Sequence, residues 1–343
     1  METTTRRAVL QSAAGLATLT WLPPIFAQSG AAGRPTAATA SGTRLVMLGT
    51  RGGPGVDLSR SETASAVIVD GVPYLVDCGY GTMRALVAAG IGYLPVDTLF
   101  FSHLHDDHTA DLAAMLAHQW TGSKASATHI YGPYSTEAMV KGAIAFFRPN
   151  VEIRMIDEGR TVPPEALFFG HDILNVGAEP VRVFADDRVV VTAVTNTHYP
   201  ERAVARMQHR SLGYRFDTST RSICFSGDTA YSANLVRLAR DADVFVCEVI
   251  DHQAHADTLA RAKAAAEAGN TESIWRHVAE THSTPADVGR MAAEANVKTV
   301  VLNHQLRGTA GTGAAGFSIS AYIDRVRSTF AGEVIVGEDQ MVL

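Results

Sequence analysis

The stretch FFSHLHDDH, residues 100–108, reads H-x-H-x-D-H and completes a short apolar run that begins at Thr98. Residues 98–101 predict a buried strand of a layered α/β fold, and residues 111–120 (DLAAMLAHQW) predict the helix that follows it. The motif therefore lies on a turn from strand to helix, where several side chains can converge on one point.

The motif contains the ligand types that zinc prefers, which are neutral imidazoles and a carboxylate. His103 and His105 are two residues apart, so their side chains point to the same side of an extended backbone. Asp107 and His108 follow on the turn and can face a second metal ion. This density of ligands argues against a chance polar loop and predicts a metal site.

The overall composition is that of a soluble globular protein. The chain has 343 residues, of which 46% are hydrophobic and 19% are charged, and its formal net charge is −6. This mild acidity gives no electrostatic argument for a nucleic-acid partner. From composition we expect one large domain or two small ones, a small-molecule substrate and no nucleic acid.

The N-terminal segment resembles a twin-arginine export signal. Arg6 and Arg7 precede an apolar stretch that ends near Thr20, and Ala27 ends a possible small-residue cleavage site. The stretch is shorter than the ~20 residues that span a bilayer, so we expect no membrane association after cleavage. The prediction is a signal peptide over 1–27, a flexible lead-in over 28–42, a hydrolase domain over 43–343, and a periplasmic location.

The three cysteines do not form a recognisable redox or metal motif. Cys78, Cys224 and Cys247 are odd in number, show no C-x-x-C spacing and lie in apolar runs. We therefore expect three small buried hydrophobic side chains rather than ligands or a disulfide.

Several later stretches match one known pattern in the right order. They are DCGYGT at 77–82, the His198 that ends NTH, SGDT at 226–229, ETHST at 280–284 and the His304 that ends NH. Together with H-x-H-x-D-H they resemble the metallo-β-lactamase superfamily, in its ribonuclease Z and arylsulfatase-like branch, from about residue 43 onward. The resemblance implies an α/β fold of the four-layer αββα sandwich type.

The resemblance also implies a dinuclear centre with two zinc ions per chain. His103, His105 and His198 would bind one ion, Asp107, His108 and His304 the other, and Asp228 would bridge them. Asp77 would orient a ligating histidine. A hydroxide held between the ions would be the nucleophile. Most metallo-β-lactamases proper lack such a bridging aspartate, so its presence favours an esterase-like hydrolase.

Two more residues receive a catalytic role from the same resemblance. His282, in H-S-T, would protonate the leaving group, and Glu248, at the end of the preceding strand, would orient it. We count both with Asp107 as catalytic. No metal role is expected for the other histidines, although His252 and His255 follow Glu248 closely and could face the cleft.

The expected activity is hydrolysis of a small aryl sulfate or phosphate ester by an exported enzyme. We find no basic, Gly-rich arm that would hold RNA, and export would separate the protein from cytoplasmic tRNA. The alternatives are a lactonase or β-lactamase acting on a cyclic carbonyl, a hydrolytic aryl dehalogenase, and a zinc-binding module without catalysis. Residues 148–180 are interpreted as an insertion that covers the site or makes a homodimer contact.

Overall fold

The computed structural model describes residues 42–53, 55–250, 252, 271–305 and 319–343. The predicted signal peptide lies outside the described residues, as do nearly all of the lead-in and His255. None of the helices in the described ranges combines the length and the apolar character needed to cross a membrane.

The first half of the domain forms a six-stranded sheet in the order β1-β2-β3-β4-β5-β6. Its strands are β1 Thr43–Gly49, β2 Ala64–Val69, β3 Val72–Val76, β4 Thr98–Phe100, β5 Thr128–Gly132 and β6 Phe168–Asp172. The pairs among β1, β2 and β3 are antiparallel, and the pairs from β3 to β6 are parallel. Asp70 and Gly71 both have positive φ, 48° and 85°, as a tight two-residue hairpin turn requires.

The second half forms a seven-stranded sheet in the order β13-β12-β11-β10-β9-β8-β7. Its strands are β7 Val181–Ala185, β8 Val189–Thr195, β9 Leu212–Thr218, β10 Ser222–Phe225, β11 Val244–Glu248, β12 Thr299–Asn303 and β13 Glu333–Val336. Strands β7 to β10 are antiparallel and β10 to β13 are parallel. The two sheets therefore repeat one plan, antiparallel strands followed by parallel ones.

The two sheets pack face to face through an apolar layer. Phe100 of β4 lies at its centre, with ring centroids 5.3 Å from Phe216 and 5.5 Å from Tyr214 of β9. In β1, Leu45 faces this layer and Val46 faces the outer helices, and both are buried. A strand buried on both faces reads as a continuous apolar run, which is why 98–101 and similar segments show no polar alternation.

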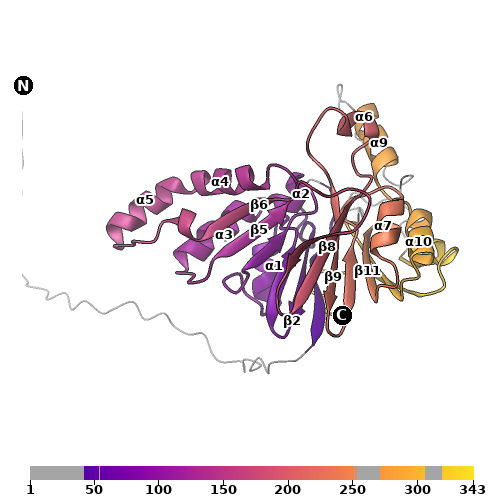
Figure 1. Cartoon of the computed structure of the whole chain (residues 1–343), viewed down its shortest axis with the longest axis horizontal. Helices are drawn as coiled ribbons and strands as arrows, with labels where there is room; N and C mark the ends of the chain where they lie inside the picture. Colours follow the sequence, from indigo (N-terminus) through magenta and orange to yellow (C-terminus); the bar gives the residue numbers. More distant parts are fainter. Residues whose placement is uncertain (1–41, 54, 251, 253–270, 306–318) are drawn as a thin grey trace, which may run out of the picture. The chain divides into compact units, whose positions relative to one another are not determined.

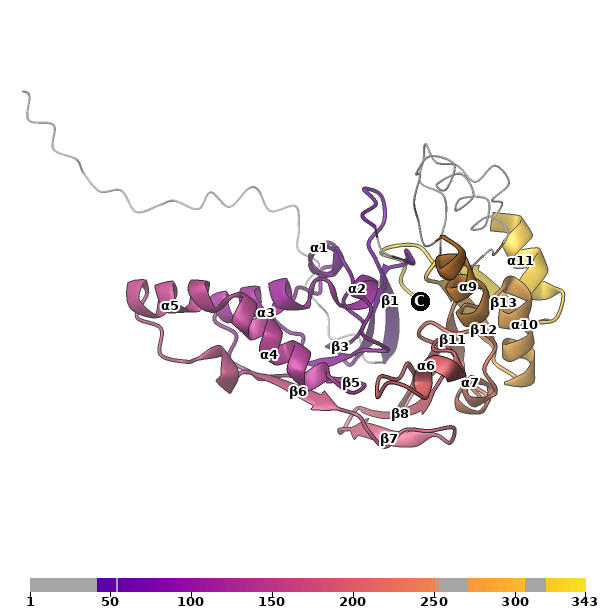
Figure 2. The same ribbon diagram turned by 90° about the horizontal axis from the view of Figure 1, so that it is seen from above.

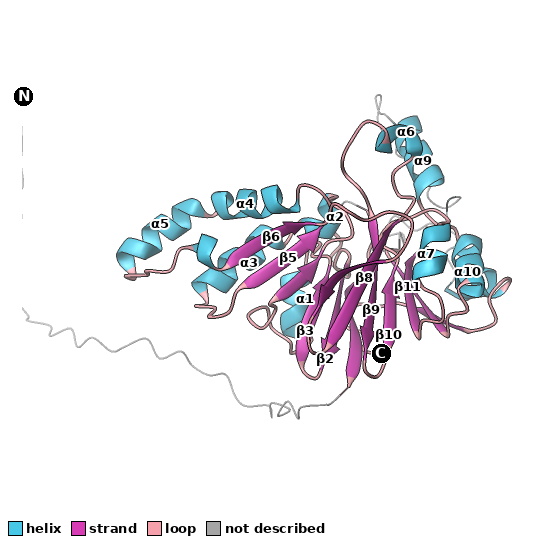
Figure 3. Ribbon diagram, viewed as in Figure 1, coloured by secondary structure: helices cyan, strands magenta, loops and turns pink. Residues whose placement is uncertain are grey.

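Helices cover the outer faces of both sheets and complete four layers (Figures 1 and 3). The first sheet is covered by α1 Thr82–Ala88, α3 Leu112–Thr121 and α4 Thr136–Phe146, and the second by α7 Ala233–Leu238, α10 Pro285–Glu294 and α11 Ile319–Arg327. Figure 2 shows the two sets of helices on opposite sides of the sheets. The expected αββα sandwich is confirmed.

Residues 148–180 contain structure that the sequence did not predict. They form helix α5 Arg148–Asp157, a short 3-10 helix at Pro164–Ala166, and β6, which extends the first sheet as its edge strand. Part of this segment therefore belongs to the sheet itself.

The three cysteines are all buried and unpaired, as expected. Each side chain is fully shielded, Cys78 beside the first helical layer and Cys224 and Cys247 in the apolar cluster under α7 and α10. Burial raises the pKa of all three thiols, so they stay protonated. They act as small apolar side chains.

Candidate metal centre

The candidate site lies where β4, β8, β10, β11 and β12 end, at one edge of both sheets. The H-x-H-x-D-H motif covers the turn after Phe100 and continues into the short helix α2 Asp106–Thr109, which carries Asp107 and His108. Two hydrogen bonds tie this turn to the second sheet: the Tyr214 hydroxyl donates to the Phe101 carbonyl (2.7 Å), and the Leu212 amide to the Ser102 carbonyl (2.8 Å). Ligands from the two halves of the chain can therefore meet here.

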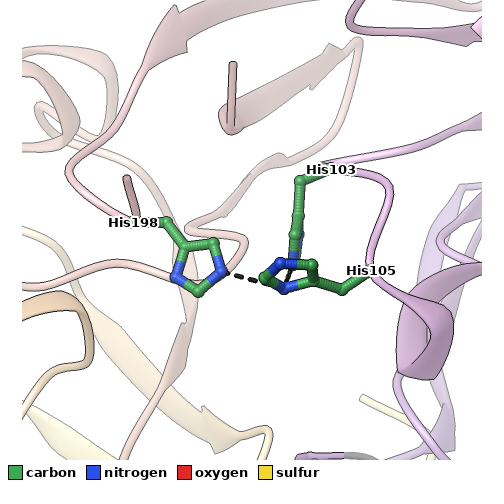
Figure 4. A group of neighbouring side chains, drawn as sticks. All are labelled: His103, His105 and His198. Atoms are coloured by element: carbon green, nitrogen blue, oxygen red, sulfur yellow. Dashed lines mark hydrogen bonds between the residues drawn. The ribbon is translucent and has the colours of Figure 1, made fainter. Parts of the chain in front are cut away.

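The first ligand group consists of His103, His105 and His198 (Figure 4). His105 Nδ1 lies 3.0 Å from His103 Nε2 and 3.1 Å from His198 Nε2. His103 and His198 are fully buried, and His105 is half-buried. Three ring nitrogens thus converge on one point, and His105 is the least buried of the three residues.

The second ligand group consists of Asp107, His108, Asp228 and His304, all buried. His304 Nε2 lies 3.2 Å from Asp107 Oδ2 and 3.1 Å from Asp228 Oδ2, and His108 Nε2 lies 3.3 Å from Asp228 Oδ1. Asp228 Oδ2 is also 3.8 Å from His103 Nε2 of the first group. Asp228 therefore stands between the two groups, as a bridging ligand would.

These residues fit bound metal ions. Among the described residues, the buried atoms that lack a hydrogen-bond partner include His108 Nε2, Asp228 Oδ1 and His304 Nδ1. Leaving a buried polar atom unpaired costs free energy, which a coordinated cation would recover for the atoms that face it. Imidazole nitrogens and carboxylate oxygens are also the donors of catalytic metal sites. Both groups could hold a metal ion.

The charge states of the two groups differ. Burial lowers the pKa of His103 and of His198 well below the usual value, so both rings are neutral, which is the ligating form. In the second group, burial is outweighed by the carboxylates, which raise the pKa of His108 and bring the pKa of His304 to about 10. Without a cation, protons neutralise the second group.

Hydrogen bonds from residues outside the two groups orient the ligands. Asp77 Oδ2 accepts from His108 Nδ1 (2.9 Å) and from the Ser102 hydroxyl (2.9 Å), so His108 Nε2 is directed at the site. The Gly53 amide donates to Asp107 Oδ2 (2.8 Å). A Cβ on Gly52 would lie 2.4 Å from His304 Nδ1, so this loop must be glycine to approach the site.

His282 and Glu248 form a buried pair beside the second group. His282 Nδ1 lies 2.9 Å from Glu248 Oε2 and 3.0 Å from Oε1, and the Thr229 amide also donates to this carboxylate. The His282 ring stacks on His304, with centroids 5.6 Å apart. Burial opposes protonation of His282, but Glu248 raises its pKa above the usual value. A protonated imidazole next to the ligand groups can donate a proton to a substrate.

The structure thus brings together the seven predicted metal ligands, His282 and Glu248, and it adds one residue that the sequence analysis missed. His277, on α9 Thr271–Thr281, lies with its ring centroid 5.3 Å from His198 and 5.5 Å from His282. Its position five residues before His282 was the available signal. His252 Nε2 lies 3.1 Å from the His282 carbonyl oxygen.

Comparisons with known proteins give the family. The model of the β-lactamase superfamily domain matches residues 73–305. The chain is 27% identical over 299 residues to ribonuclease Z of Mycobacterium avium, covering 86% of this chain and 95% of that one. It is 29% identical over 265 residues to ribonuclease Z of a Mycobacterium species (strain KMS), covering 76% and 84%.

Solved structures show the same fold. The short form of human tRNase Z superposes with a TM-score of 0.57 at 20% identity, covering 88% of this chain and 98% of that one. A metallo-β-lactamase fold protein from Bacillus subtilis gives a TM-score of 0.58 at 16% identity, with the same coverage.

These findings correct two expectations. The aryl sulfate or phosphate ester as substrate, and the exclusion of nucleic acid as partner, are contradicted by relatives that are named ribonuclease Z. Both expectations were drawn from net charge, from a missing basic arm and from the export signal. None of these features describes the metal site itself. Hydrolysis of a phosphodiester and hydrolysis of a small ester need the same metal ligands, so the ligands do not distinguish the two substrates. The chain belongs to the metallo-β-lactamase superfamily, and it is a metal-dependent hydrolase.

Proposed function

We propose that this protein is a zinc-dependent phosphodiesterase that hydrolyses RNA. The observation that carries the proposal is the placement of His282, paired with Glu248, beside two adjacent ligand groups that share Asp228. Such a site combines charge stabilisation with a proton donor for a poor leaving group. The resemblance to ribonuclease Z supports RNA as the class of substrate.

Two zinc ions suit the donor set. His103, His105 and His198 would hold one ion, Asp107, His108 and His304 the other, and Asp228 would contact both. When bound, zinc lowers the pKa of water to about 7 and stabilises negative charge on phosphoryl oxygens. Asp77 and the Gly53 amide keep His108 and Asp107 in place.

The chain's own residues supply the proton that the leaving oxygen needs. Cleavage of the P–O3′ bond leaves an alkoxide, which is a poor leaving group unless it is protonated. His282 Nε2 faces away from Glu248, because Nδ1 makes the contacts with that carboxylate. Glu248 raises the pKa of His282 above its usual value, which favours the protonated ring that a proton donor requires.

The loop that follows His198 carries arginines, which supports a phosphate backbone as the ligand. The loop between β8 and β9 carries Arg202, Arg206 and Arg210, and it contains the short helix α6 Glu201–Val204. Arg202 pairs with Glu280 at 2.7 Å, which ties this loop to α9. Arg206 is exposed. With a net charge of −6, the chain relies on such local contacts rather than on a broad basic surface.

The test compares leaving groups. Zinc-loaded protein is assayed on a 3′-extended RNA and on bis-p-nitrophenyl phosphate, with and without chelator. We expect chelator-sensitive cleavage of the RNA to a 3′-hydroxyl and a 5′-phosphate. His282→Ala should slow RNA cleavage by about 10²–10⁴-fold and the nitrophenyl ester much less, because nitrophenolate leaves without a proton. No RNA cleavage by the zinc-loaded wild type would refute the proposal.

We also propose that residues 1–27 direct export. The proposal is supported by the Arg6-Arg7 pair and the apolar stretch after it. Fractionation of cells that express the full chain should place the shortened protein in the periplasm, and replacement of both arginines by lysine should abolish this. Full-length protein in the cytoplasm in both cases would contradict the proposal.

A further inference from the structure

His277 packs against both His198 of the first ligand group and His282, whose rings are themselves in contact with centroids 5.0 Å apart. Its ring centroid lies 5.3 Å from that of His198, 5.5 Å from that of His282 and 6.1 Å from that of His105. One of its ring nitrogens lies within 4.8 Å of ligand nitrogens of His198 and His282. If the proposed function holds, the ribose that carries the leaving O3′ must pass this point, because His282 protonates that oxygen.

The hydrogen bonds of Thr281 define the tautomer of His277. The Thr281 hydroxyl donates its single hydrogen to the His277 carbonyl at 2.7 Å. The same oxygen lies 3.3 Å from His277 Nδ1 and can only accept there, so Nδ1 carries the hydrogen. Nε2 then presents a lone pair. A histidine ring is neutral above its ordinary pKa of about 6.5, so this lone pair is present at pH 7.

An accepting nitrogen restricts what His277 can bind. It repels phosphoryl oxygens, which are also acceptors, and it attracts either a metal ion or a hydroxyl group. A third metal ion would lack ligands, because His198 Nε2 already lies 3.1 Å from His105 Nδ1 in the first group. His282 would be its only other ligand among the described residues of the group. A hydroxyl of the substrate fits better.

We propose that His277 accepts a hydrogen bond from the ribose 2′-hydroxyl next to the scissile bond and thereby selects RNA over DNA. This assignment rests on the proposed function. The 2′-hydroxyl and O3′ are on neighbouring carbon atoms, and His277 and His282 are neighbouring rings with centroids 5.5 Å apart. One imidazole accepts from the 2′-oxygen while the other donates to O3′. The 2′-hydroxyl is the group by which proteins distinguish RNA from DNA.

The experiment uses two oligonucleotides that differ in one atom. One is a 3′-extended RNA, and the other has a single 2′-deoxynucleotide on the 5′ side of the cleavage site. Wild-type zinc-loaded protein should cleave the all-ribose strand about tenfold faster, which corresponds to one hydrogen bond. In His277→Phe the ratio of the two kcat/KM values should fall to about 1. His277→Gln, whose amide oxygen can accept in the place of Nε2, should restore part of the ratio.

A matched control is His118, a helical histidine on the surface whose Nδ1 bonds the Ala114 carbonyl at 2.9 Å. His118→Phe should keep the wild-type ratio. If His277→Phe slows both strands equally, or lowers the zinc content, the assignment is wrong although the proposed function stands. If the wild type cleaves bis-p-nitrophenyl phosphate but no RNA, the proposed function fails, and the assignment fails with it.

Discussion

The two ligand groups lie side by side, yet they differ in charge, burial and support. The first contains three imidazoles and no carboxylate, and its His105 is only half-buried. The second contains two carboxylates and two imidazoles, is buried throughout, and is tied to Asp77 and to the loop at Gly53. The first is a set of neutral donors, whereas the second has a charge that must be compensated.

This difference indicates an order of filling. A divalent cation gains more electrostatic energy between Asp107 and Asp228 than among neutral rings, and burial strengthens that gain. We therefore expect the second group to bind zinc more tightly. Asp228 does not belong to one group alone, because its Oδ2 lies close to ligand atoms of both groups.

The largest effect is expected from Asp228→Ala, which removes a carboxylate of the second group that also lies 3.8 Å from His103 Nε2 of the first. Zinc content should fall at both, and hydrolysis should slow by more than the 10–100-fold typical of losing a supporting residue. His105→Ala should remove only the ion of the first group. Metal analysis of both variants checks this, and equal zinc content in the two would contradict the bridging position.

Asp77→Asn should weaken the second group more than the first, which Asp77 reaches only through Ser102 and its 3.1 Å contact with His103 Nδ1. An asparagine would offer an amide N–H to His108 Nδ1 and turn its ring hydrogen toward the metal, so zinc affinity there should fall about 10–100-fold. Competition with a chromogenic chelator measures both affinities. Asp70→Asn, in an exposed hairpin turn, is the control. A weaker first group with an unchanged second one would reverse our assignment.

The number of protons released when zinc binds should differ between the two groups. The pKa of His304 is about 10 without metal, so zinc displaces a proton from it at pH 7, and affinity for the second group should rise with pH up to that value. His103 and His198 have lowered pKa values and are already neutral, so the first group should release none. Calorimetry in buffers of different ionisation enthalpy counts the protons. Equal release from both groups would be incompatible with this picture.

The smallest effect should come from Thr284→Ala, which touches neither group. Thr284 and Asp287 form a reciprocal cap at the start of α10, directly after His282. Its loss should lower the free energy of unfolding by about 1 kcal/mol. Chemical denaturation measures this, and zinc content should stay the same. A loss of zinc would show that the cap also positions the ligands.

Much of the fold and of the site could be predicted because the signals are local. Apolar runs such as 98–101 mark the buried strands, and the ligands follow directly on strand ends. The strand β6 was missed because its sequence, FFGHD, is short and lies after a segment rich in proline and glycine. His277 was missed because its role depends on where α9 lies in space. Substrate class depends on surfaces that no motif describes.

The buried thiols leave the described surface free of reactive sulfur. A single cysteine placed at an exposed position such as Ser123 would therefore be the one site open to maleimide or nitroxide labels, with Cys78, Cys224 and Cys247 left in place. A nitroxide there, combined with a paramagnetic ion such as Mn²⁺ in place of zinc, would allow electron spin resonance to report which ligand group fills first. The order of loading could thus be read by spectroscopy in an otherwise unaltered protein.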